Sequence, residues 1–459
     1  MRPYFFKIYS FFLIIMRTIT KFTSILLSGV LVSSSFLCGC QSSNLSASDP
    51  VTLTMWHVYG EQAQSPMNEL IDEFNETVGK EKGVVIDVPL VSNASEIGQQ
   101  LLDAQAGKAG AGSMPDLFTC YPGSAAALGT DNLVDWKQDF SEDELSGIVP
   151  EFLDEGIIDD QLTVFPICKS TRLLYINGTE FNRFSEATGI TADSLSTWDG
   201  FFSAASAYHE WSGRPFCAFD YILQNVDFYA RSLGGNAATE DRWYDTENDT
   251  FHAVWDQFAE SLIRGDIIVS DQYANTQMMT GEVPAGVGSS AAILYFNNTV
   301  TYSDNTSEPM NLQVLPLPQP EGGENVAPQT GCGICCTAGD AKKEKAAAVF
   351  LRWFLDSDRN LEFAAETGYM PVVKDSFDSI DSYTFKDASY SAVYSAIRTV
   401  KDTCRFDPLP EGAGYIEKTN RFYTELRKRR STLTQDFENG TDIAVLKQQL
   451  WDLLCQTKG

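Results

Sequence analysis

The stretch VTLTMWHVYGEQAQSPMNELIDEFNETVGKEKGVVIDVPLV, residues 51–91, decides the fold class. It opens with an apolar and β-branched run over 51–57, which predicts a strand. Ser65-Pro66 then predicts a helix start, because serine is a good N-cap and proline fits the first turn. Apolar side chains recur at helical spacing over 67–78, and 84–91 predicts the next strand. A chain that opens strand–helix–strand favours a layered α/β fold.

The rest of the chain continues this alternation, and its length suits two ordinary domains. No internal repeat of about 20–50 residues is visible. We expect helices over 95–106, 197–211, 341–355, 358–367 and 418–454, and extended segments over 116–121, 162–167, 172–176, 285–295, 311–317 and 331–337.

The N-terminal segment has the pattern of a signal peptide. Arg17 and Lys21 precede an apolar run over 22–37, which is too short for a comfortable membrane span and ends in small residues. Its ending, Leu37-Cys-Gly-Cys40, resembles the lipobox of bacterial lipoproteins. The resemblance implies cleavage before Cys40, whose thiol and new amino group would carry the lipid. Acyl chains contribute about 0.8 kcal/mol per buried methylene, which holds a domain on the outer face of a membrane.

These features predict a lipoprotein signal peptide over 1–39, followed by a lipid anchor and flexible tether over 40–50. Met16 begins a complete signal peptide by itself, which favours a translation start there over one at Met1. The alternative interpretation is an uncleaved N-terminal helix with Cys40 as an ordinary thiol.

Charge narrows the class of ligand. The chain carries 62 acidic against 33 basic residues, a formal net charge of −29. Removal of the leader takes away cations only, so the remaining chain is more acidic still. Such a field repels nucleic acids and anionic lipid headgroups, and we expect no nucleic-acid partner. A neutral ligand suits this protein best, and an anion would need a local positive site.

Cysteine usage leaves the thiol state open. An exported chain could form disulfides, but most of the cysteines after the leader lie in apolar runs, where buried thiols behave as small hydrophobes. We favour mostly reduced thiols for Cys120, Cys168, Cys217, Cys332, Cys335, Cys336, Cys404 and Cys455. The run Cys332-Gly-Ile-Cys335-Cys336 has the look of a redox or metal motif, but a second Cys or His pair at zinc spacing is missing. We expect neither a metal nor a cofactor.

Signatures of catalysis are weak. The glycine-rich run 107–112 lacks a Gly-Lys-Ser/Thr sequence and follows a predicted helix, which argues against a nucleotide site. No Gly-x-Ser-x-Gly elbow occurs. Paired carboxylates for glycoside hydrolysis are compatible with so many acids, although any such pair could arise by chance. We therefore expect a binding protein rather than an enzyme, with a surface glycoside hydrolase as an alternative.

Aromatic residues mark the end of the first strand. Trp56, His57 and Tyr59 lie where that strand gives way to a loop, and ligands of open α/β sheets bind beyond the carboxyl ends of strands. Flat rings there suit stacking on a sugar. The alternatives are that Trp56 belongs to the core and that His57 is a structural hydrogen-bonding residue.

Several segments, in order, resemble the extracellular solute-binding proteins of family 1, the carbohydrate-type receptors of ABC importers. The resemblance covers nearly all of the chain after the leader, and its order is more specific than any single motif. It rests on 53–57, 68–75, 114–118, 165–177, Thr197-Trp-Asp199, 347–355 and Thr367-Gly-Tyr-Met-Pro371.

The resemblance implies an α/β fold of the periplasmic-binding-protein type II, with two α/β lobes around a ligand cleft and several hinge crossings. We expect the N-lobe to hold 51–167 plus 287–338 and the C-lobe 168–286 plus 339–459. It also implies a monomeric receptor that delivers its ligand to ABC permease subunits with a cytoplasmic ATPase. With the lipobox, this places the protein on the extracellular face of the membrane, in a Gram-positive cell. A receptor for a sensor kinase would reuse the same fold.

Within this family, the glycerol-3-phosphate and glycerophosphodiester binders are the most similar. Their contact positions match Pro166-x-x-Lys169-Ser170-Thr171, Ser289-Ser290, Gly331-x-Gly333 and Tyr369. The C-terminal arginine with which those proteins bind phosphate has no clear equivalent in this sequence, since Thr419 or Asn420 occupies that position. A phosphate would therefore lack the two parallel, charge-assisted hydrogen bonds that a guanidinium supplies. We therefore expect a sugar or oligosaccharide, with the phosphate-containing ligands as the alternative.

The predicted ligand-binding set combines these sources. For the serine and threonine hydroxyls the alternative is a hydrogen bond to local backbone, and two of the tyrosines are included by position alone. The set is Trp56, His57, Tyr59, Tyr121, Ser170, Thr171, Tyr221, Ser289, Ser290, Gly333 and Tyr369.

Overall fold

The computed structural model describes residues 45–60, 65–236, 244–270, 273–410 and 413–457. The signal peptide, the translation start and the lipid-bearing Cys40 predicted above lie outside these ranges. Within them, no helix has the length and apolar character needed to cross a membrane. Two five-stranded sheets organise the described chain.

The first sheet is mostly parallel. Its strands lie in the order β2 (Val84–Val91), β1 (Val51–His57), β3 (Leu117–Cys120), β15 (Gly333–Cys336) and β6 (Phe165–Pro166). β15 runs antiparallel to both neighbours, and Gly333 lies opposite Cys120 on one side and Pro166 on the other. The carboxyl ends of β1, β3 and β6 therefore meet the amino end of β15, and we call this the first edge.

The second sheet has mixed directions. Its order is β13 (Leu312–Pro316), β7 (Arg172–Asn177), β10 (Ala285–Ser289), β8 (Cys217–Phe219) and β9 (Ile267–Val269). Arg172 at the start of β7 lies opposite Ser289 at the end of β10, while β10, β8 and β9 are parallel. The amino end of β7 therefore meets the carboxyl ends of β8, β9 and β10, and we call this the second edge.

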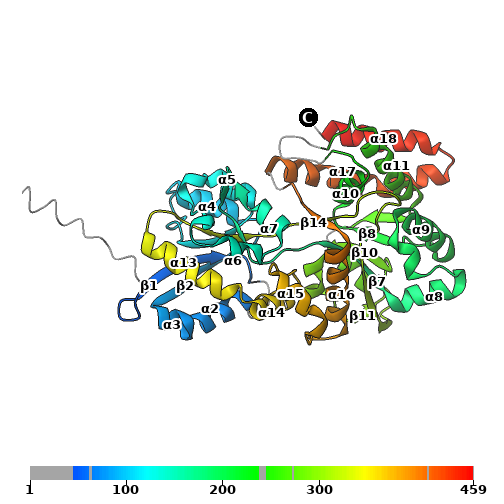
Figure 1. Cartoon of the computed structure of the whole chain (residues 1–459). Helices are drawn as coiled ribbons and strands as arrows, with labels where there is room; N and C mark the ends of the chain where they lie inside the picture. The colour runs from blue at the N-terminus through cyan, green and yellow to red at the C-terminus, as the bar shows by residue number, and fades with distance from the viewer. Residues whose placement is uncertain (1–44, 61–64, 237–243, 271–272, 411–412, 458–459) are drawn as a thin grey trace, which may run out of the picture. The chain divides into compact units, whose positions relative to one another are not determined.

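Helices cover both sheets, as Figure 1 shows. Ser65 caps the first of them by accepting a bond from the Asn68 amide, as its sequence predicts. Beside the first sheet lie α2 (Pro66–Glu76), α3 (Val78–Lys82), α4 (Ile97–Gln105), α5 (Pro122–Leu128), α6 (Glu142–Ser146), α7 (Pro150–Glu155), α13 (Ala341–Phe354) and α14 (Ser357–Thr367). With the second sheet lie α8 (Gly178–Thr188), α9 (Trp198–Ser212), α10 (Ile222–Ser232), α11 (Asp249–Arg264), α12 (Ala274–Met279), α16 (Ala388–Thr403), α17 (Ala413–Glu438) and α18 (Ile443–Thr457).

Smaller elements complete the chain. They are α15 (Lys374–Ser379), the two-stranded pairs β4 (Ile157–Ile158) with β5 (Gln161–Leu162), β11 (Thr299–Thr301) with β12 (Ser307–Pro309) and β14 (Val326–Gln329) with β16 (Arg405–Pro408), and 3-10 turns over Thr130–Asn132, Trp136–Gln138, Ala192–Ser196, Ser290–Tyr295 and Ile380–Ser382.

Two segments carry the chain between the sheets here, and a third lies against them while it stays bonded to 147–149 beside the first sheet. We call the three the crossing segments. They are 167–171 between β6 and β7, 330–332 between β14 and β15, and 368–373 between α14 and α15. Backbone bonds join them, because Lys169 pairs with Met370 and Ser170 pairs with Thr330. The predicted multiple crossings are therefore present, and the two edges lie at either end of the same short segments.

The division of the chain between the lobes differs from the predicted one. β10 and β13 both pair with β7, so the second sheet holds 285–289 and 312–316, and the chain returns to the first sheet only at 330–332. The segment 341–354, expected in the C-lobe, packs on the first sheet because the buried alanines and phenylalanines of α13 face β1. Strand pairing decides the first correction and helix packing the second, and the sequence displays neither.

Two local predictions also change. The tether expected over 40–50 is folded from Leu45 onward, since Leu45 packs on the core and Ser46 bridges to Asp49. The extended segment expected over 285–295 ends at Ser289, whose hydroxyl accepts a bond from the Ala291 amide and starts a 3-10 turn.

Candidate functional site

The two edges and the crossing segments bring many of the predicted residues together. Ligands of α/β proteins bind beyond the carboxyl ends of strands, and here two such edges meet at the crossing segments. We take the first edge, the second edge and the crossing segments as the candidate site and describe each from its side chains.

The aromatic residues after the first strand lie in the core. Trp56 packs with Phe118 and other buried side chains. The His57 ring is held by Asn68 Oδ1 at 2.8 Å and accepts the Tyr59 amide at 3.2 Å, and burial lowers the pKa of His57 although the bond to Asn68 opposes the shift. These rings therefore present no broad open face here, and the stacking role predicted for them gains no support.

Tyr59 is also enclosed. Its hydroxyl lies 3.2 Å from Cys168 Sγ, and its ring meets Phe363 edge-on at 5.1 Å between centroids. Burial raises its pKa well above the ordinary tyrosine value, so the hydroxyl stays protonated. Tyr59 fixes the first edge against the crossing segments.

Gly333 and Tyr121 lie on the first edge as well. A Cβ at Gly333 would come within 2.6 Å of the Phe165 carbonyl oxygen, so strand packing alone accounts for this glycine. Tyr121 follows β3 as the N-cap residue of α5 and is half-buried. Of these two, Tyr121 is the one placed to reach a ligand.

Tyr369 comes close to the second edge. The preceding Gly368 has a φ of +70°, and a Cβ there would lie 2.9 Å from the Ala291 Cα atom. The turn that carries Tyr369 therefore packs directly on the 3-10 turn after Ser290. The Tyr394 hydroxyl donates to the Tyr369 carbonyl at 2.7 Å, which fixes the backbone while the ring stays half-buried.

The four predicted hydroxyls gather on the second edge. Ser170 Oγ and Ser289 Oγ lie 2.9 Å apart, and the Ser290 amide donates to the Thr171 carbonyl at 2.8 Å. The hydroxyls of Thr171 and Ser290 are buried and have no hydrogen-bond partner among the described residues. Unpartnered buried hydroxyls carry a free-energy cost, but Thr171 is 1% and Ser290 0% exposed, so neither hydroxyl is open to a ligand in this arrangement of the chain.

Arg172 adds a cation that the sequence analysis overlooked. Its guanidinium carbon lies 4.6 Å from the centre of the Tyr221 ring, and its Nη2 donates to Gln224 Oε1 at 3.0 Å. The residue is 9% exposed, and its buried Nε has no hydrogen-bond partner in the described chain. The sequence feature that could have identified Arg172 is a basic residue at the start of an otherwise apolar strand.

Asp220 and Arg427 flank this cation. Asp220 Oδ1 accepts from Ser270 Oγ at 3.0 Å and from the Ala274 amide at 2.6 Å. Burial raises the pKa of Asp220, while those bonds and the charge of Arg172 act against the shift. Arg427 Nε donates to the Ser270 carbonyl at 2.7 Å. The carboxylate is therefore committed to its neighbours on the second edge.

Two exposed tyrosines border the second edge, and sequence analysis did not find them either. Tyr273 is 59% exposed and precedes Ala274, whose amide binds Asp220. Tyr295 is 49% exposed, and its carbonyl accepts from Asn275 Nδ2 at 3.3 Å. Neither lies in a motif.

Lys169, matched above to a contact position of the phosphate-ligand binders, is occupied inside the protein. Its Nζ lies 2.8 Å from Glu155 Oε2 and 3.3 Å from the Gly331 carbonyl oxygen. It is 1% exposed. Lys169 therefore organises the crossing segments rather than presenting its charge to a ligand.

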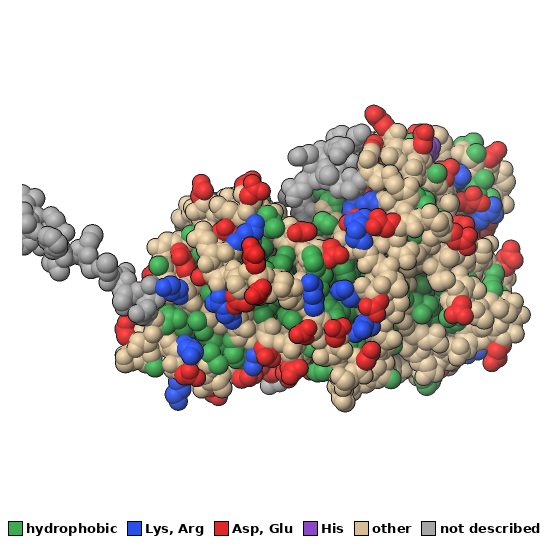
Figure 2. All heavy atoms as spheres, viewed as in Figure 1, with side chains coloured by type: hydrophobic (Ala, Val, Ile, Leu, Met, Phe, Trp, Pro, Cys, Tyr) green, Lys and Arg blue, Asp and Glu red, His purple; other side chains and the backbone are tan. Residues whose placement is uncertain are grey.

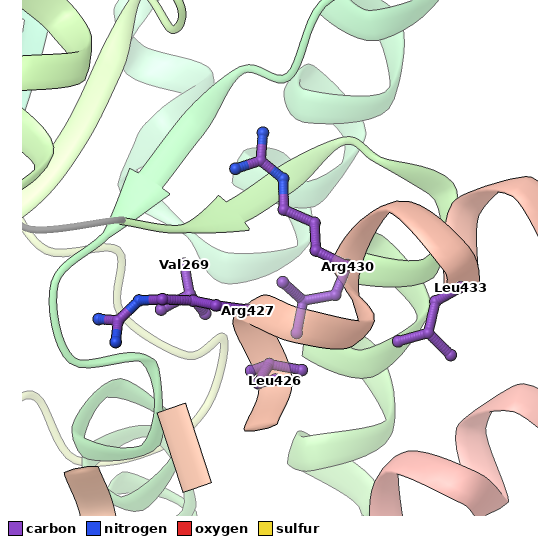
Figure 3. Close-up of a pocket in the computed structure, with 6 residues that line it drawn as sticks. Val269, Leu426, Arg427, Arg430 and Leu433 are labelled. Carbon is purple, nitrogen blue, oxygen red and sulfur yellow. The ribbon is translucent and has the colours of Figure 1, made fainter. Parts of the chain in front are cut away.

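A cavity beside β9 is too small for a solute. It holds about 10 Å³, room for about one water molecule, and in Figure 3 the charged ends of Arg427 and Arg430 extend away from Val269 and Leu426. Acidic side chains are spread over the face of the protein seen in Figure 2. In the described ranges no cluster of His, Cys, Asp and Glu could hold a metal ion, and the eight cysteines there form no disulfide.

Comparison with known proteins gives a family and a fold. Residues 69–389 match the family model of the bacterial extracellular solute-binding proteins. No curated protein sequence matches the chain.

Solved structures are similar over almost their whole length. The cyclic α-maltosyl-1,6-maltose binding protein from Arthrobacter globiformis has a TM-score of 0.65 at 17% identity and covers 88% of this chain and 99% of its own. The sugar-binding protein MalE from Xanthomonas citri has a TM-score of 0.63 at 15% identity, covering 88% and 98%. UgpB from Mycobacterium tuberculosis, in complex with glycerophosphocholine, has a TM-score of 0.62 at 17% identity, covering 89% and 98%. These likenesses confirm the predicted type II periplasmic-binding-protein fold.

Proposed function

Since the chain belongs to the family of bacterial extracellular solute-binding proteins, we propose that it is the substrate-binding lipoprotein of an ABC importer. It captures a sugar or oligosaccharide between its two lobes and delivers it to the permease subunits. The family relatives described above are binding proteins, and we infer that no bond of the ligand is broken here.

The hydroxyl cluster on the second edge supports this proposal most directly. The hydroxyls of Thr171 and Ser290 are buried and find no partner in the described part of the chain, and the neighbouring Ser170 and Ser289 bond to each other. Hydroxyls that both donate and accept suit the hydroxyls of a sugar. The exposed Tyr273 precedes α12 and the exposed Tyr295 ends the 3-10 turn that begins at Ser290, and rings of this kind suit the apolar face of a pyranose.

The crossing segments provide the motion. A ligand that bonds to both edges binds the closed arrangement better than the open one, and it shifts the population by that difference in affinity. Three short segments joined by backbone bonds allow a hinge rotation without rearranging either sheet. Tyr369, whose turn packs against the second edge, would then touch a ligand held there.

A thermal-shift screen of the purified full-length protein tests the binding function. A ligand that binds only the native state raises the melting temperature, by an amount that grows with its concentration above Kd. We expect at least one member of a panel of neutral maltooligosaccharides, acidic sugars and glycerophosphodiesters to do so. A flat response across all three classes would contradict the proposal.

Two variants test the part played by the exposed rings. Tyr273→Ala and Tyr295→Ala should each weaken the identified ligand by about 3- to 10-fold, the usual contribution of a stacked ring. Trp211→Ala is the matched control, because Trp211 is 42% exposed but lies on α9, whose residues pack in the second sheet's own core. An equal loss in all three variants would show a general effect on folding.

The lipid anchor has its own test. Labelling of cells with a palmitate analogue should mark the protein, and Cys40→Ser should abolish both the label and membrane retention. Release of the unmodified protein into the medium by both forms would refute anchoring.

A phosphate-containing polyol is the second candidate ligand. Arg172 on the second edge favours it, because a buried guanidinium whose Nε has no partner among the residues described suits an anionic oxygen.

A further inference from the structure

The segment 45–50 is fastened to the first sheet at the amino end of β1. The Asp49 amide donates to the Ser46 carbonyl at 3.0 Å. Lys342 Nζ lies 2.7 Å from Asp49 Oδ2 and 3.1 Å from the Asp49 carbonyl oxygen, which ties the segment to the first turn of α13. A Cβ at Gly83 would collide with the Ser46 carbonyl, so the segment also packs closely on the end of α3. The chain is therefore part of the folded protein from residue 45 onward.

This attachment leaves little chain between the folded protein and the proposed lipid. Cys40 and Leu45 are five positions apart in the sequence. Because an extended chain spans at most about 3.6 Å per residue, the two are separated by no more than about 18 Å. Charges are screened over about 8 Å at physiological salt, so a lipid on Cys40 would hold the surface around Leu45 within roughly two screening lengths of the membrane. At that distance the charges of this surface act on the membrane, and those elsewhere on the protein are largely screened.

Five lysines of the described chain surround this attachment. They lie on the two helices that contact the segment 45–50, as Lys80 and Lys82 on α3 and Lys342, Lys343 and Lys345 on α13. Both helices reach the same short stretch of chain, because the Gly83 carbonyl at the end of α3 accepts the Val51 amide at 2.9 Å. Figure 2 shows Lys and Arg side chains over α3 and α13. We define the anchor face as residues 45–50, 78–83 and 340–345.

The anchor face is close to neutral in a strongly acidic protein. It holds five lysines and four acids, whereas the whole chain has 33 basic and 62 acidic residues. The ion pairs that involve it in the described ranges are Lys82–Glu81 at 2.8 Å, Lys342–Asp49 at 2.7 Å and Lys343–Asp116 at 2.7 Å. Asp340 and Glu344 accept bonds from backbone amides around the start of α13. Lys80, Lys82 and Lys345 are exposed at the surface.

A membrane with anionic headgroups distinguishes such a face from the rest of an acidic surface. Each lysine close to an anionic leaflet raises the affinity for it by about fivefold, and acids that no cation balances are repelled. A protein of net charge −29 can therefore settle on an anionic membrane only through a face where cations balance the acids.

We propose that the anchor face docks on the anionic outer surface of the membrane, with Lys80, Lys82 and Lys345 in contact with lipid headgroups. The inference rests on the proposed lipoprotein function and adds the face through which the protein meets the membrane. β1 runs from this face to the first edge, and its seven residues rise about 3.3 Å each, which places the first edge about 20 Å farther along the strand. Docking therefore leaves the candidate site uncovered.

Amine labelling of the lipidated full-length protein on vesicles tests the docking. One set of vesicles holds equal parts of phosphatidylglycerol and phosphatidylcholine, and the other holds phosphatidylcholine alone. The reagent is sulfosuccinimidyl acetate, which carries one negative charge, and peptide mass spectrometry reports each lysine. We expect Lys80, Lys82 and Lys345 to react at least about 3-fold more slowly on the anionic vesicles, since an anionic leaflet depletes a singly charged anion by about that factor. Lys428, whose side chain is 64% exposed on α17, should react equally fast on both.

Charge reversal identifies the groups responsible. Lys80→Glu combined with Lys82→Glu turns two cations of the anchor face into acids. Lys345 is unchanged in this variant, and on the anionic vesicles it should then react about as fast as on the neutral ones. Lys428→Glu combined with Arg429→Glu is the matched control, because it makes the same charge change at exposed positions of α17 and should leave Lys345 protected. Circular dichroism melts establish that each variant is folded.

Flotation with the vesicles separates the two levels of the proposal. If the protein floats but its anchor-face lysines react equally fast on both kinds of vesicle, the docking is overturned and the lipoprotein function stands. Slow labelling that extends equally to Lys428 also overturns it, because no particular face is then held at the membrane. If Lys345 stays protected in the charge-reversed variant, the lysines of α3 do not hold the face. If the protein carries no lipid and does not float, the proposed anchor and this inference fail together.

Discussion

Replacing Lys169 by methionine should destabilise the protein strongly, because it breaks an ion pair sealed inside the crossing segments. Lys169 Nζ and Glu155 Oε2 are 2.8 Å apart, and their side chains are 2% and 5% exposed. Gln329 Nε2 also donates to Glu155 Oε2 at 2.8 Å, but Glu155 Oε1 has no partner among the described residues. Methionine would therefore leave a buried carboxylate held by a single amide.

The expected magnitude follows from that geometry. Removing one partner of a buried ion pair typically costs about 3–5 kcal/mol, since the remaining charge loses its compensation but not its burial. Lys169→Met should lower the free energy of unfolding by that amount. The double variant Lys169→Met with Glu155→Leu should recover most of the loss, because two apolar side chains of similar size leave no buried charge.

Urea unfolding followed by tryptophan fluorescence measures these differences, with circular dichroism as a second probe of cooperativity. Lys428→Met is the matched control, because Lys428 lies 2.7 Å from Glu425 on the surface, and we expect no resolvable change there. A Lys169→Met protein within about 1 kcal/mol of the wild type would refute the reasoning. So would a double variant as unstable as the sum of its single changes.

Three further predictions concern single groups. Burial raises the pKa of Asp220, so the folded state binds its proton more tightly than the unfolded chain does. The stability of the protein therefore falls as pH rises through that pKa. In urea unfolding between pH 4 and 7, Asp220→Asn should remove this dependence of stability on pH, without loss of stability at pH 7. The hydrogen bond from Arg352 lowers the pKa of Glu144 to about 2, so the stability that Glu144 contributes is present above the pKa of the unfolded chain and is lost as pH falls through about 2. Because the pair is half-exposed, Glu144→Gln should lower the free energy of unfolding by at most about 1 kcal/mol at pH 7. The variant should match the stability of the wild type near pH 2. Cys120 Sγ and Cys335 Sγ lie 3.6 Å apart on neighbouring strands, but both residues are 0% exposed, so oxidised glutathione should leave them reduced in the folded protein. An intramolecular disulfide, detected as a loss of about 2 Da that Cys335→Ser prevents, should form only when the oxidant is present during refolding.

The fold could be predicted because the hydrophobic pattern of each segment and the order of the segments along the chain indicate it. The strand–helix–strand stretch over 51–91 forms as expected, with Ser65 capping its helix. The lobe boundaries were not predictable, because they depend on which strands pair with β7. β13 joins the second sheet through its register with β7, from Leu312 opposite Asn177 to Pro316 opposite Leu173. Nothing local in 312–316 distinguishes that partner from the first sheet.

The candidate site was predictable where the family resemblance matched motifs and not elsewhere. Ser170 and Ser289 meet through their hydroxyls, and Thr171 and Ser290 meet through a backbone bond. Whether any of the four touches a ligand stays a prediction. Trp56 and its neighbours were chosen for their place at a strand end, but a strand end can be as buried as a strand centre when a helix covers it. Exposure of the rings at 273 and 295 is a property of tertiary packing, which no motif records.

The net charge of the protein does not by itself determine the charge of its ligand, and the second edge illustrates why. The charge of −29 is spread over the surface, where salt at about 0.15 M screens interactions beyond about 8 Å. An anion bound at Arg172 instead meets a guanidinium that is buried and stacked 4.6 Å from an aromatic ring, in surroundings where water screens little. The composition therefore limits how an anionic ligand approaches the protein, whereas the few groups of the second edge decide whether it stays bound. A composition that argues against anions in general therefore leaves the phosphate-containing ligand proposed above dependent on Arg172.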